Sequence, residues 1–392
     1  MKLLVMLLAA LPVWGQVVRL QIADVPAGLR AAFPADFPGY LELLDGETAR
    51  RVEEGEWEHA VYYILQSKRF TPLAPIEPAL SARDLYRGAA GDVVPAEVTA
   101  RMDAFLESRS ADERSRYFRK LLGVDSAAAR ERLKREYLRA MRFLYEKEFL
   151  SKAREGSDRR SFIAGLYQSR AHSSDTELAA SFAVSVGLSV LGEMRPRARL
   201  ERVLLIGPGL DFAPRTGLKD DRQPASLQPF VLSALLPGSR IVCADVNPRV
   251  VEFLGRFLQS KQAELDLDWA AEDDDQRAFL GRLGGAKLAV TGERMRSVSI
   301  RRLNILTGRL GETFDLVVAT NVFVYFSDKE LILALSNIRA MLRTGGFLMH
   351  NDLRGPIDEL SNSLGMPPLH ARMIRLSAKR ELYDNVVIHQ VR

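Results

Sequence analysis

Two apolar segments that end in turns constrain the fold of this chain more than any other feature. Residues 201–209 read ERVLLIGPG, and residues 241–248 read IVCADVNP. The first segment ends at Gly207 and Gly209, and the second contains an acidic residue, Asp245, where its apolar run stops. In a nucleotide-binding β–α–β unit, the first turn brings backbone amides to the ligand, and the acidic residue hydrogen-bonds the ribose hydroxyls. The pair predicts a site for a ligand that contains adenosine.

Short apolar runs alternate with helical stretches from residue 201 to the end of the chain. The runs expected to be strands are 203–206, 241–244, 297–303, 316–319, 346–350, 372–377 and 385–391, and the expected helices are 226–236, 247–262 and 329–342. Such alternation is typical of a doubly wound α/β fold. Only residues 378–384 separate the last two strands, too few for a helical crossover, so these strands are expected to pair as an antiparallel hairpin. We therefore predict a Rossmann-like sheet of seven strands with mixed directions.

Residues 16–155 show helical periodicity and no strand pattern. Apolar residues recur at three- and four-residue steps in the stretches 41–70, 95–108, 110–123 and 125–152. We predict an all-helical N-terminal domain at 16–155, followed by a ligand-binding α/β domain at 156–392.

The first fifteen residues, MKLLVMLLAALPVWG, resemble a secretory leader. They combine one basic residue with an apolar run, a proline and a small residue before Gln16. This pattern predicts a signal peptide at 1–15 and an exported protein. The alternative is that the leader is not used and the protein is cytoplasmic. The apolar run is too short for a transmembrane helix, and no later segment is long enough for one.

Charge and cysteine content narrow the range of partners. The formal net charge is +5, but the basic residues are spread among acidic ones, so we expect no nucleic-acid partner. The single cysteine, Cys243, excludes an intrachain disulfide. The five histidines have no metal-ligand spacing, so no metal site is predicted.

The glycine turn itself distinguishes between adenosine cofactors. A dinucleotide site needs a third glycine at the start of a helix, where the pyrophosphate binds. Here Gly209 is followed by Leu210 and Asp211, and a helical pattern begins only near Ser226. A carboxylate at position 211 would repel a diphosphate and suit a sulfonium or an ammonium group. The turn therefore favours S-adenosylmethionine over NAD or FAD.

Residues 200–350 resemble a class I S-adenosylmethionine-dependent methyltransferase. Within that superfamily, residues 297–326, SVSIRRLNILTGRLGETFDLVVATNVFVYF, are similar to the chemotaxis-receptor glutamate methyltransferases. Those enzymes have Leu-Asn-Leu at one strand end and a Phe-Asp strand that runs into Asn-Val-x-x-Tyr-Phe. Position 320 is Thr here, whereas that family normally has Arg. The resemblance implies the fold and the cofactor, and we do not extend it to receptor glutamate as the substrate.

The turn and the resemblance together indicate a set of cofactor-binding residues. Asn304 is expected near the adenine, Asp245 near the ribose, and Asn321 near the methionine part. In an alternative interpretation, Asp245 caps the following helix, and both asparagines are turn residues. The complete set comprises Gly207, Gly209, Asp211, Asp245, Val246, Asn304, Ile305, Asn321 and Val322.

The sequence predicts methyl transfer from S-adenosylmethionine to an oxygen or nitrogen atom of an unidentified acceptor, and it identifies no catalytic residue. Methyl transfer depends mainly on alignment of the reacting groups, so a catalytic dyad is not required. One alternative is a noncatalytic binding protein on the same fold. A less favoured one is an NAD-dependent enzyme. We also expect the N-terminal helices and residues 172–177 to close over Gly207, Asp245 and Asn321.

Overall fold

The computed structural model describes residues 16–65, 82–109, 113–123, 126–173, 178–210, 215–216, 226–260, 263–267, 271–377 and 382–392. The predicted leader at 1–15 and the candidate site residue Asp211 lie outside these residues.

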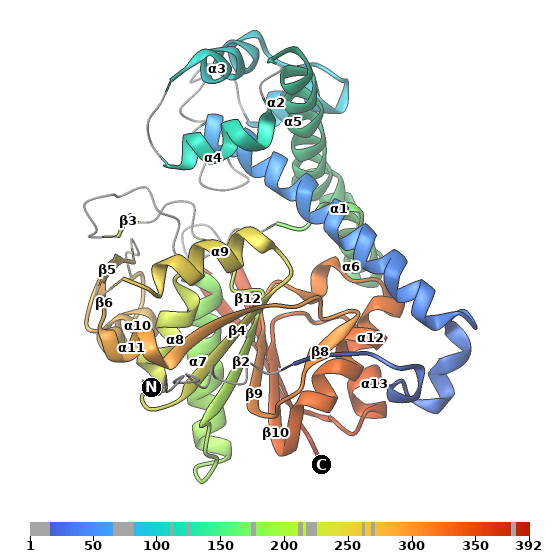
Figure 1. The fold of residues 1–392 in the computed structure, drawn as a ribbon, viewed down its shortest axis with the longest axis vertical. Helices are drawn as coiled ribbons and strands as arrows, with labels where there is room; N and C mark the ends of the chain where they lie inside the picture. The colour runs from blue at the N-terminus through green and yellow to red at the C-terminus, as the bar shows by residue number, and fades with distance from the viewer. Residues whose placement is uncertain are drawn as a thin grey trace, which may run out of the picture.

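Seven strands form the central sheet (Figure 1). Strand β12 is antiparallel to both of its neighbours, and the other adjacent pairs are parallel. The strands correspond to the seven predicted ones, and the predicted hairpin of the last two is confirmed. Their order across the sheet is β11 (Pro368–Ser377), β12 (Leu382–Gln390), β10 (Leu342–His350), β9 (Phe314–Ala319), β2 (Arg202–Ile206), β4 (Arg240–Asp245) and β7 (Val298–Arg302).

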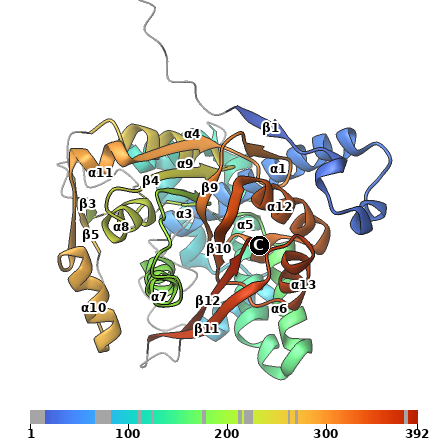
Figure 2. The same ribbon diagram turned by 90° about the horizontal axis from the view of Figure 1, so that it is seen from below.

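Helices cover both faces of this sheet, which explains why its inner strands are apolar without alternation. Val203 and Leu205 of β2 point into one core, and Leu204 and Ile206 point into the other. Figure 2 shows the two groups of helices on opposite sides of the sheet. The first core contains residues of α7 (Leu178–Met194), α8 (Gln228–Leu235), α9 (Pro248–Phe257) and α10 (Asp274–Leu283), and the second contains residues of α12 (Asp328–Met341) and α13 (Gly355–Ser363).

A helical unit, called the cap below, rises above the sheet in Figure 1. Its longest helix, α1, has 28 residues and is therefore about 42 Å long. The cap core includes the buried side chains of Phe118, Leu133 and Tyr137, and it is continuous with Val250 and Phe253 of α9. The cap consists of α1 (Phe37–Ile64), α2 (Ala82–Ala90), α3 (Ala96–Glu107), α4 (Glu113–Leu122), α5 (Ser126–Glu148) and α6 (Gly156–Ser169).

The segment before α1 packs on the sheet domain. It contains a strand that the sequence analysis did not predict, β1 (Val17–Arg19), which pairs with β8 (Gly308–Leu310). Leu20 and Phe33 then pack against Leu333 of α12. Helix α1 therefore starts beside the sheet domain and ends in the cap core. The domain boundary at 155/156 stays a prediction.

A small second sheet was also not predicted. It consists of β3 (Arg215–Thr216), β5 (Ala263–Asp266) and β6 (Lys287–Val290), each four residues or shorter. Strands this short lack a periodic pattern that distinguishes them from loops. A short helix, α11 (Gly292–Ser297), joins this sheet to β7.

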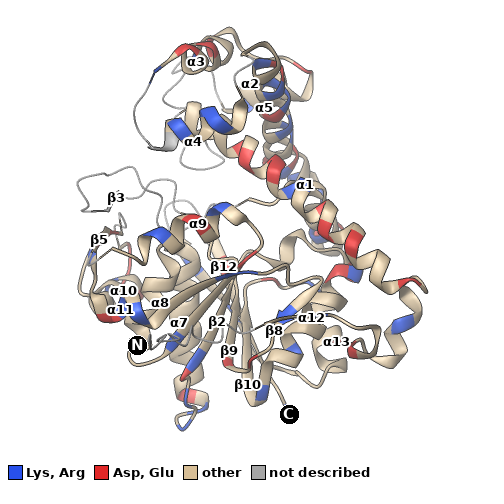
Figure 3. Cartoon of the chain, in the orientation of Figure 1, with Lys and Arg blue, Asp and Glu red and all other residues tan. Residues whose placement is uncertain are grey.

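The surface carries both signs of charge. In the view of Figure 3, basic and acidic residues are interspersed along α1 and α5. Within the described residues, no helix is both long and apolar enough to span a bilayer.

Candidate functional site

The glycine turn follows β2 and has the backbone shape that only glycine adopts easily. Gly207 and Gly209 have φ angles of 66° and 59°, in the left-handed region. A Cβ on Gly207 would lie 2.8 Å from a methyl carbon of Val322. The Ser226 hydroxyl donates a hydrogen bond of 3.0 Å to the Pro208 carbonyl, which holds the start of α8 against the turn. Both glycines line the cavity described below, where no Cβ stands between the backbone and a ligand.

Asp245 ends β4 as a buried carboxylate. It accepts hydrogen bonds from the backbone amides of Asn247 at 2.8 Å and Gly209 at 3.4 Å. Its pKa is raised to about 7, mainly by burial and also by the nearby charge of Glu56, against the effect of the amides. The cap of α9 is Asn247, whose side chain accepts from the Arg249 amide at 2.9 Å. Asn247, and not Asp245, therefore caps α9.

Asn304 lies in the turn after β7, and both ends of its side-chain amide are engaged within the protein. The amide nitrogen donates to Asp45 of α1 at 2.8 Å, and the amide oxygen accepts from the Leu306 backbone at 3.1 Å. Thr307 also donates to Asp45, at 2.7 Å. Asn304 thus shapes its turn and joins it to the cap, in agreement with the turn interpretation.

Asn321 follows β9 in a strained backbone conformation. Its φ of 57° is unusual for a residue other than glycine. Asn351, which follows β10, compensates by accepting from the Asn321 amide at 2.9 Å and donating to its side-chain oxygen at 2.8 Å. The same Asn351 amide also reaches Asp384 of β12, at 3.2 Å. The ends of three strands thus hold this corner of the site.

Gln228, at the start of α8, was missed by the sequence analysis. Its side-chain nitrogen donates to the Thr320 hydroxyl at 2.8 Å. Its side-chain oxygen is buried and has no hydrogen-bond partner among the described residues. Thr320 therefore interacts with Gln228 at the position where the receptor methyltransferases have Arg. No local pattern marks a glutamine at a helix start as a site residue.

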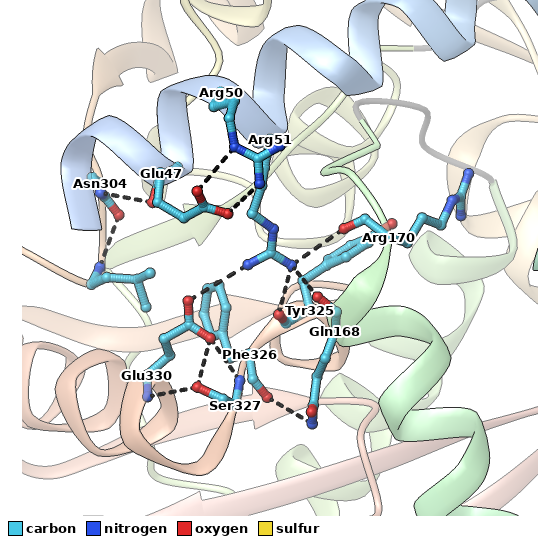
Figure 4. A network of polar contacts seen from close by, with 12 residues as sticks. Glu47, Arg50, Arg51, Gln168, Arg170, Asn304, Tyr325, Phe326, Ser327 and Glu330 are labelled. Atoms are coloured by element: carbon cyan, nitrogen blue, oxygen red, sulfur yellow. Dashed lines mark hydrogen bonds and ion pairs between the residues drawn. The ribbon is translucent and has the colours of Figure 1, made fainter. Parts of the chain in front are cut away.

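Arg51 of α1 fastens the cap over this edge of the sheet. Figure 4 shows its guanidinium among backbone carbonyls from two other segments. It donates to the carbonyls of Gln168 at 2.9 Å, Tyr325 at 3.1 Å and Arg170 at 3.3 Å. It also lies 3.5 Å from Glu330, which accepts from the Ser327 backbone at the start of α12. Burial lowers the pKa of Arg51.

The segment after α6 lies directly beneath α1. The His172 amide donates to the Arg51 carbonyl at 3.2 Å. A Cβ on Gly55 of α1 would lie 1.7 Å from the His172 carbonyl oxygen, so the two backbones touch. His59 and Ser173 are hydrogen-bonded at 3.1 Å. Residues 174–177, the rest of the expected covering segment, lie outside the described residues.

These elements enclose one cavity, of about 100 Å³. All the candidate site residues inside the described ranges line it, together with Gln228, Thr48 and Val52 of α1, and His172 and Ser173. A second cavity, of about 510 Å³, adjoins it and shares Val246 and Asn304 as wall residues. The second cavity extends under α1 toward Tyr117 and Arg302. The two cavities meet on the side where the adenine was expected.

No protein-family model matches the chain. The solved structures similar to it include the N-methyltransferase NodS of Bradyrhizobium japonicum with S-adenosylhomocysteine, at 15% identity and a TM-score of 0.32, over 54% of this chain and 87% of NodS. The TehB-like S-adenosylmethionine-dependent methyltransferase of Corynebacterium glutamicum has 14% identity and a TM-score of 0.32, over 60% of this chain and 96% of its own. Magnesium protoporphyrin IX methyltransferase of Synechocystis has 10% identity and a TM-score of 0.32, over 63% and 97%.

The strand order assigns the fold independently of these likenesses. The five parallel strands have the order β10, β9, β2, β4, β7, and an antiparallel β12 lies between β10 and β11. This is the class I methyltransferase arrangement that the sequence predicted, with a helical unit before it.

Proposed function

We propose that this chain binds S-adenosylmethionine and transfers a methyl group to an oxygen or nitrogen atom of an acceptor. The observation that carries the proposal is the meeting of the left-handed Gly207–Gly209 turn and the buried Asp245 carboxylate in one cavity at the ends of adjacent parallel strands. Open α/β sheets bind ligands at this edge.

The residues present suit the parts of this cofactor. A carboxylate has about four acceptor positions, and the backbone amides of Asn247, Gly209 and Val246 hydrogen-bond Asp245. An acceptor position therefore remains for a ribose hydroxyl. Val246 and Ile305 offer apolar surface to the adenine, and the unpartnered Gln228 oxygen offers an acceptor to an ammonium group. When bound, the cofactor supplies an electrophilic methyl group, and these side chains orient it and exclude water.

The cavity sizes support a ligand that extends beneath α1. Pockets for ligands of this size typically enclose about 300–1,000 Å³. The cavity at the glycine turn has about 100 Å³, and its neighbour has about 510 Å³. We therefore expect the adenosine part to continue from Asp245 into the second cavity, between α1 and the turn that contains Asn304.

Calorimetric titration of the full chain with S-adenosylhomocysteine and, separately, with NAD tests the proposal. We expect saturable binding of S-adenosylhomocysteine and at least tenfold weaker binding of NAD, because the turn offers no helix start to a pyrophosphate directly after Gly209. Tighter binding of NAD would support the NAD-dependent alternative. If the chain binds neither ligand, the proposed function is contradicted. A noncatalytic protein would bind S-adenosylhomocysteine and release none from S-adenosylmethionine with any acceptor.

A further inference from the structure

The imidazole of His172 lines the cavity with one nitrogen unused. Its Nε2 atom is buried and has no hydrogen-bond partner among the described residues. Three of the other four histidines are engaged: His59 bonds Ser173 at 3.1 Å, and His350 and His389 bond each other at 2.9 Å. A buried polar atom without a partner costs free energy in a folded protein. Because His172 is a wall residue of the cavity, a bound ligand is a candidate partner for this atom.

The ring is held in one orientation. It stacks on Tyr325 with ring centroids 5.2 Å apart and an interplanar angle of 20°. Its backbone is fixed from above by Gly55 and by the hydrogen bond to the Arg51 carbonyl. The backbone carbonyl of Tyr325 accepts from the same Arg51. Arg51 therefore hydrogen-bonds the backbone of both residues whose rings stack, His172 and Tyr325.

This position is on the methionine side of the proposed cofactor site. Tyr325 belongs to the short turn of helix Phe323–Tyr325, which begins two residues after Asn321. The adenine side is formed by Val246 and Asn304, which also border the second cavity, whereas His172 borders only the first of these two cavities. His172 thus belongs to the side of the cavity where the methionine part of the cofactor is expected.

Burial and the nearby charge of Arg51 lower the pKa of His172 to about 3, which favours the neutral imidazole at neutral pH. A neutral imidazole presents either a lone pair or an N–H at Nε2. A sulfonium charge in the same cavity favours the lone pair, because an N–H dipole would point its positive end at the cation.

We propose that Nε2 of His172 accepts a hydrogen bond from the nucleophilic group of the methyl acceptor. The acceptor then carries a proton on that group, as an amine or a hydroxyl does and a carboxylate does not. This inference rests on the proposed function and narrows it. It distinguishes this site from that of the glutamate methyltransferases, whose acceptor is a carboxylate and would face the His172 lone pair with no proton to share.

The test compares two ligands that differ at the reacting position. Sinefungin is an analogue of S-adenosylmethionine in which a carbon with an amino group replaces the methylated sulfur, whereas S-adenosylhomocysteine has a bare sulfur there. We expect the full chain to bind sinefungin more tightly than S-adenosylhomocysteine, because the amino group donates to Nε2. In His172→Leu, the dissociation constant of S-adenosylhomocysteine divided by that of sinefungin should fall by about tenfold or more. This is the loss expected when a hydrogen bond to a charged group is removed.

Two controls keep the outcome decisive. His370 of β11 also has a buried Nε2 without a partner in the described part of the chain, and it lies outside the cavity wall. His370→Leu should leave the ratio unchanged, and His172→Gln, which keeps an acceptor oxygen, should restore part of it. An unchanged ratio in a folded His172→Leu protein would overturn the inference. Failure of the wild-type chain to bind S-adenosylhomocysteine would overturn the proposed function instead.

If His172→Leu does not fold, the wild-type protein still gives an answer. Labelling with ¹⁵N-histidine yields signals from only five residues, and the His172→Gln variant assigns one of them. We expect the His172 Nε2 signal to shift on addition of sinefungin and to shift little with S-adenosylhomocysteine. Equal responses to the two ligands would contradict the inference.

Discussion

The central strands of the sheet half bury apolar side chains, whereas the cap half also buries charged ones. Residues 203–206 and 241–244 of β2 and β4 are apolar and buried, and their strands end in the polar groups of the site. The cap interior contains Glu56, Glu58 and Arg170 with at most 5% of each residue exposed. The sheet therefore supports its side of the site through apolar packing, whereas the cap also depends on a few buried charged groups that require one another.

The largest effect should come from the buried ion pair between Arg170 and Glu58, in which both side chains are at most 4% exposed. Glu58→Leu or Arg170→Met alone should destabilise the protein by about 3–5 kcal/mol, because each leaves an unpaired buried charge. The double variant should recover most of that loss. Urea unfolding monitored by fluorescence and circular dichroism measures both. Single variants whose free energy of unfolding lies within about 1 kcal/mol of wild type would show that the cap does not depend on this buried ion pair.

A smaller effect is expected where α1 touches the His172 backbone. Gly55→Ala should cost about 1–3 kcal/mol of stability and weaken binding of S-adenosylhomocysteine, because the new Cβ would lie 1.7 Å from the His172 carbonyl oxygen. The matched control is Gly46→Ala in the same helix, where a Cβ meets nothing within 4 Å. That control should gain up to about 1 kcal/mol from helix propensity. Equal gains in both variants would mean that the cap and the segment at His172 are not in contact in solution.

On the sheet side, Asp245→Ala should weaken binding of S-adenosylhomocysteine by about 1.5–3 kcal/mol with little change in fold. The pH dependence adds a second signature. The pKa of Asp245 is raised to about 7, and the ionised form accepts the ribose hydroxyls, so affinity in the wild-type protein should fall about tenfold between pH 8 and pH 6. Calorimetry at the two pH values measures it. Asp245→Asn should flatten this pH dependence. If the affinity of the wild-type protein for S-adenosylhomocysteine does not change with pH, Asp245 does not bind the ribose.

The smallest change in stability per residue is expected for His350 of β10 and His389 of the neighbouring β12, which are hydrogen-bonded to each other. Burial lowers the pKa of both, so the unfolded chain binds more protons below its ordinary pKa of about 6.5. Stability should therefore fall as pH falls through 6.5, by at most about 1 kcal/mol for each histidine between pH 6.5 and 5.5.

Two other groups contribute in the same range of pH. His172, with its pKa lowered to about 3, acts in the same direction. Asp245 acts in the opposite direction, because its folded-state pKa lies above its unfolded value and its proton uptake stabilises the fold as pH falls below 7. The measurement is therefore made by urea unfolding in an Asp245→Asn background. Stability that rises on acidification in that background would contradict the assignment of neutral histidines.

The sequence by itself determined the sheet and the sheet side of the site. Continuous apolar runs specify buried parallel strands, and the glycine turn and Asp245 sit at strand ends whose position follows from the fold. Every candidate residue within the described ranges reaches the cavity wall for that reason. The sequence also indicated helices within 41–70, 95–108, 110–123 and 125–152, because their apolar spacing is local.

Only the tertiary structure decided the cap side. Gln228, Arg51 and His172 acquire their roles from partners far away along the chain: Gln228 meets Thr320, Arg51 meets Tyr325, and His172 stacks on Tyr325. A pattern of local spacing carries no information about such pairings, because a buried polar side chain is specified by whatever the fold brings to it. The same reason applies to the hydrogen bond from the Asn304 amide to Asp45 of α1, which no local pattern predicts; the ligand contact that the family resemblance implies for Asn304 stays a prediction.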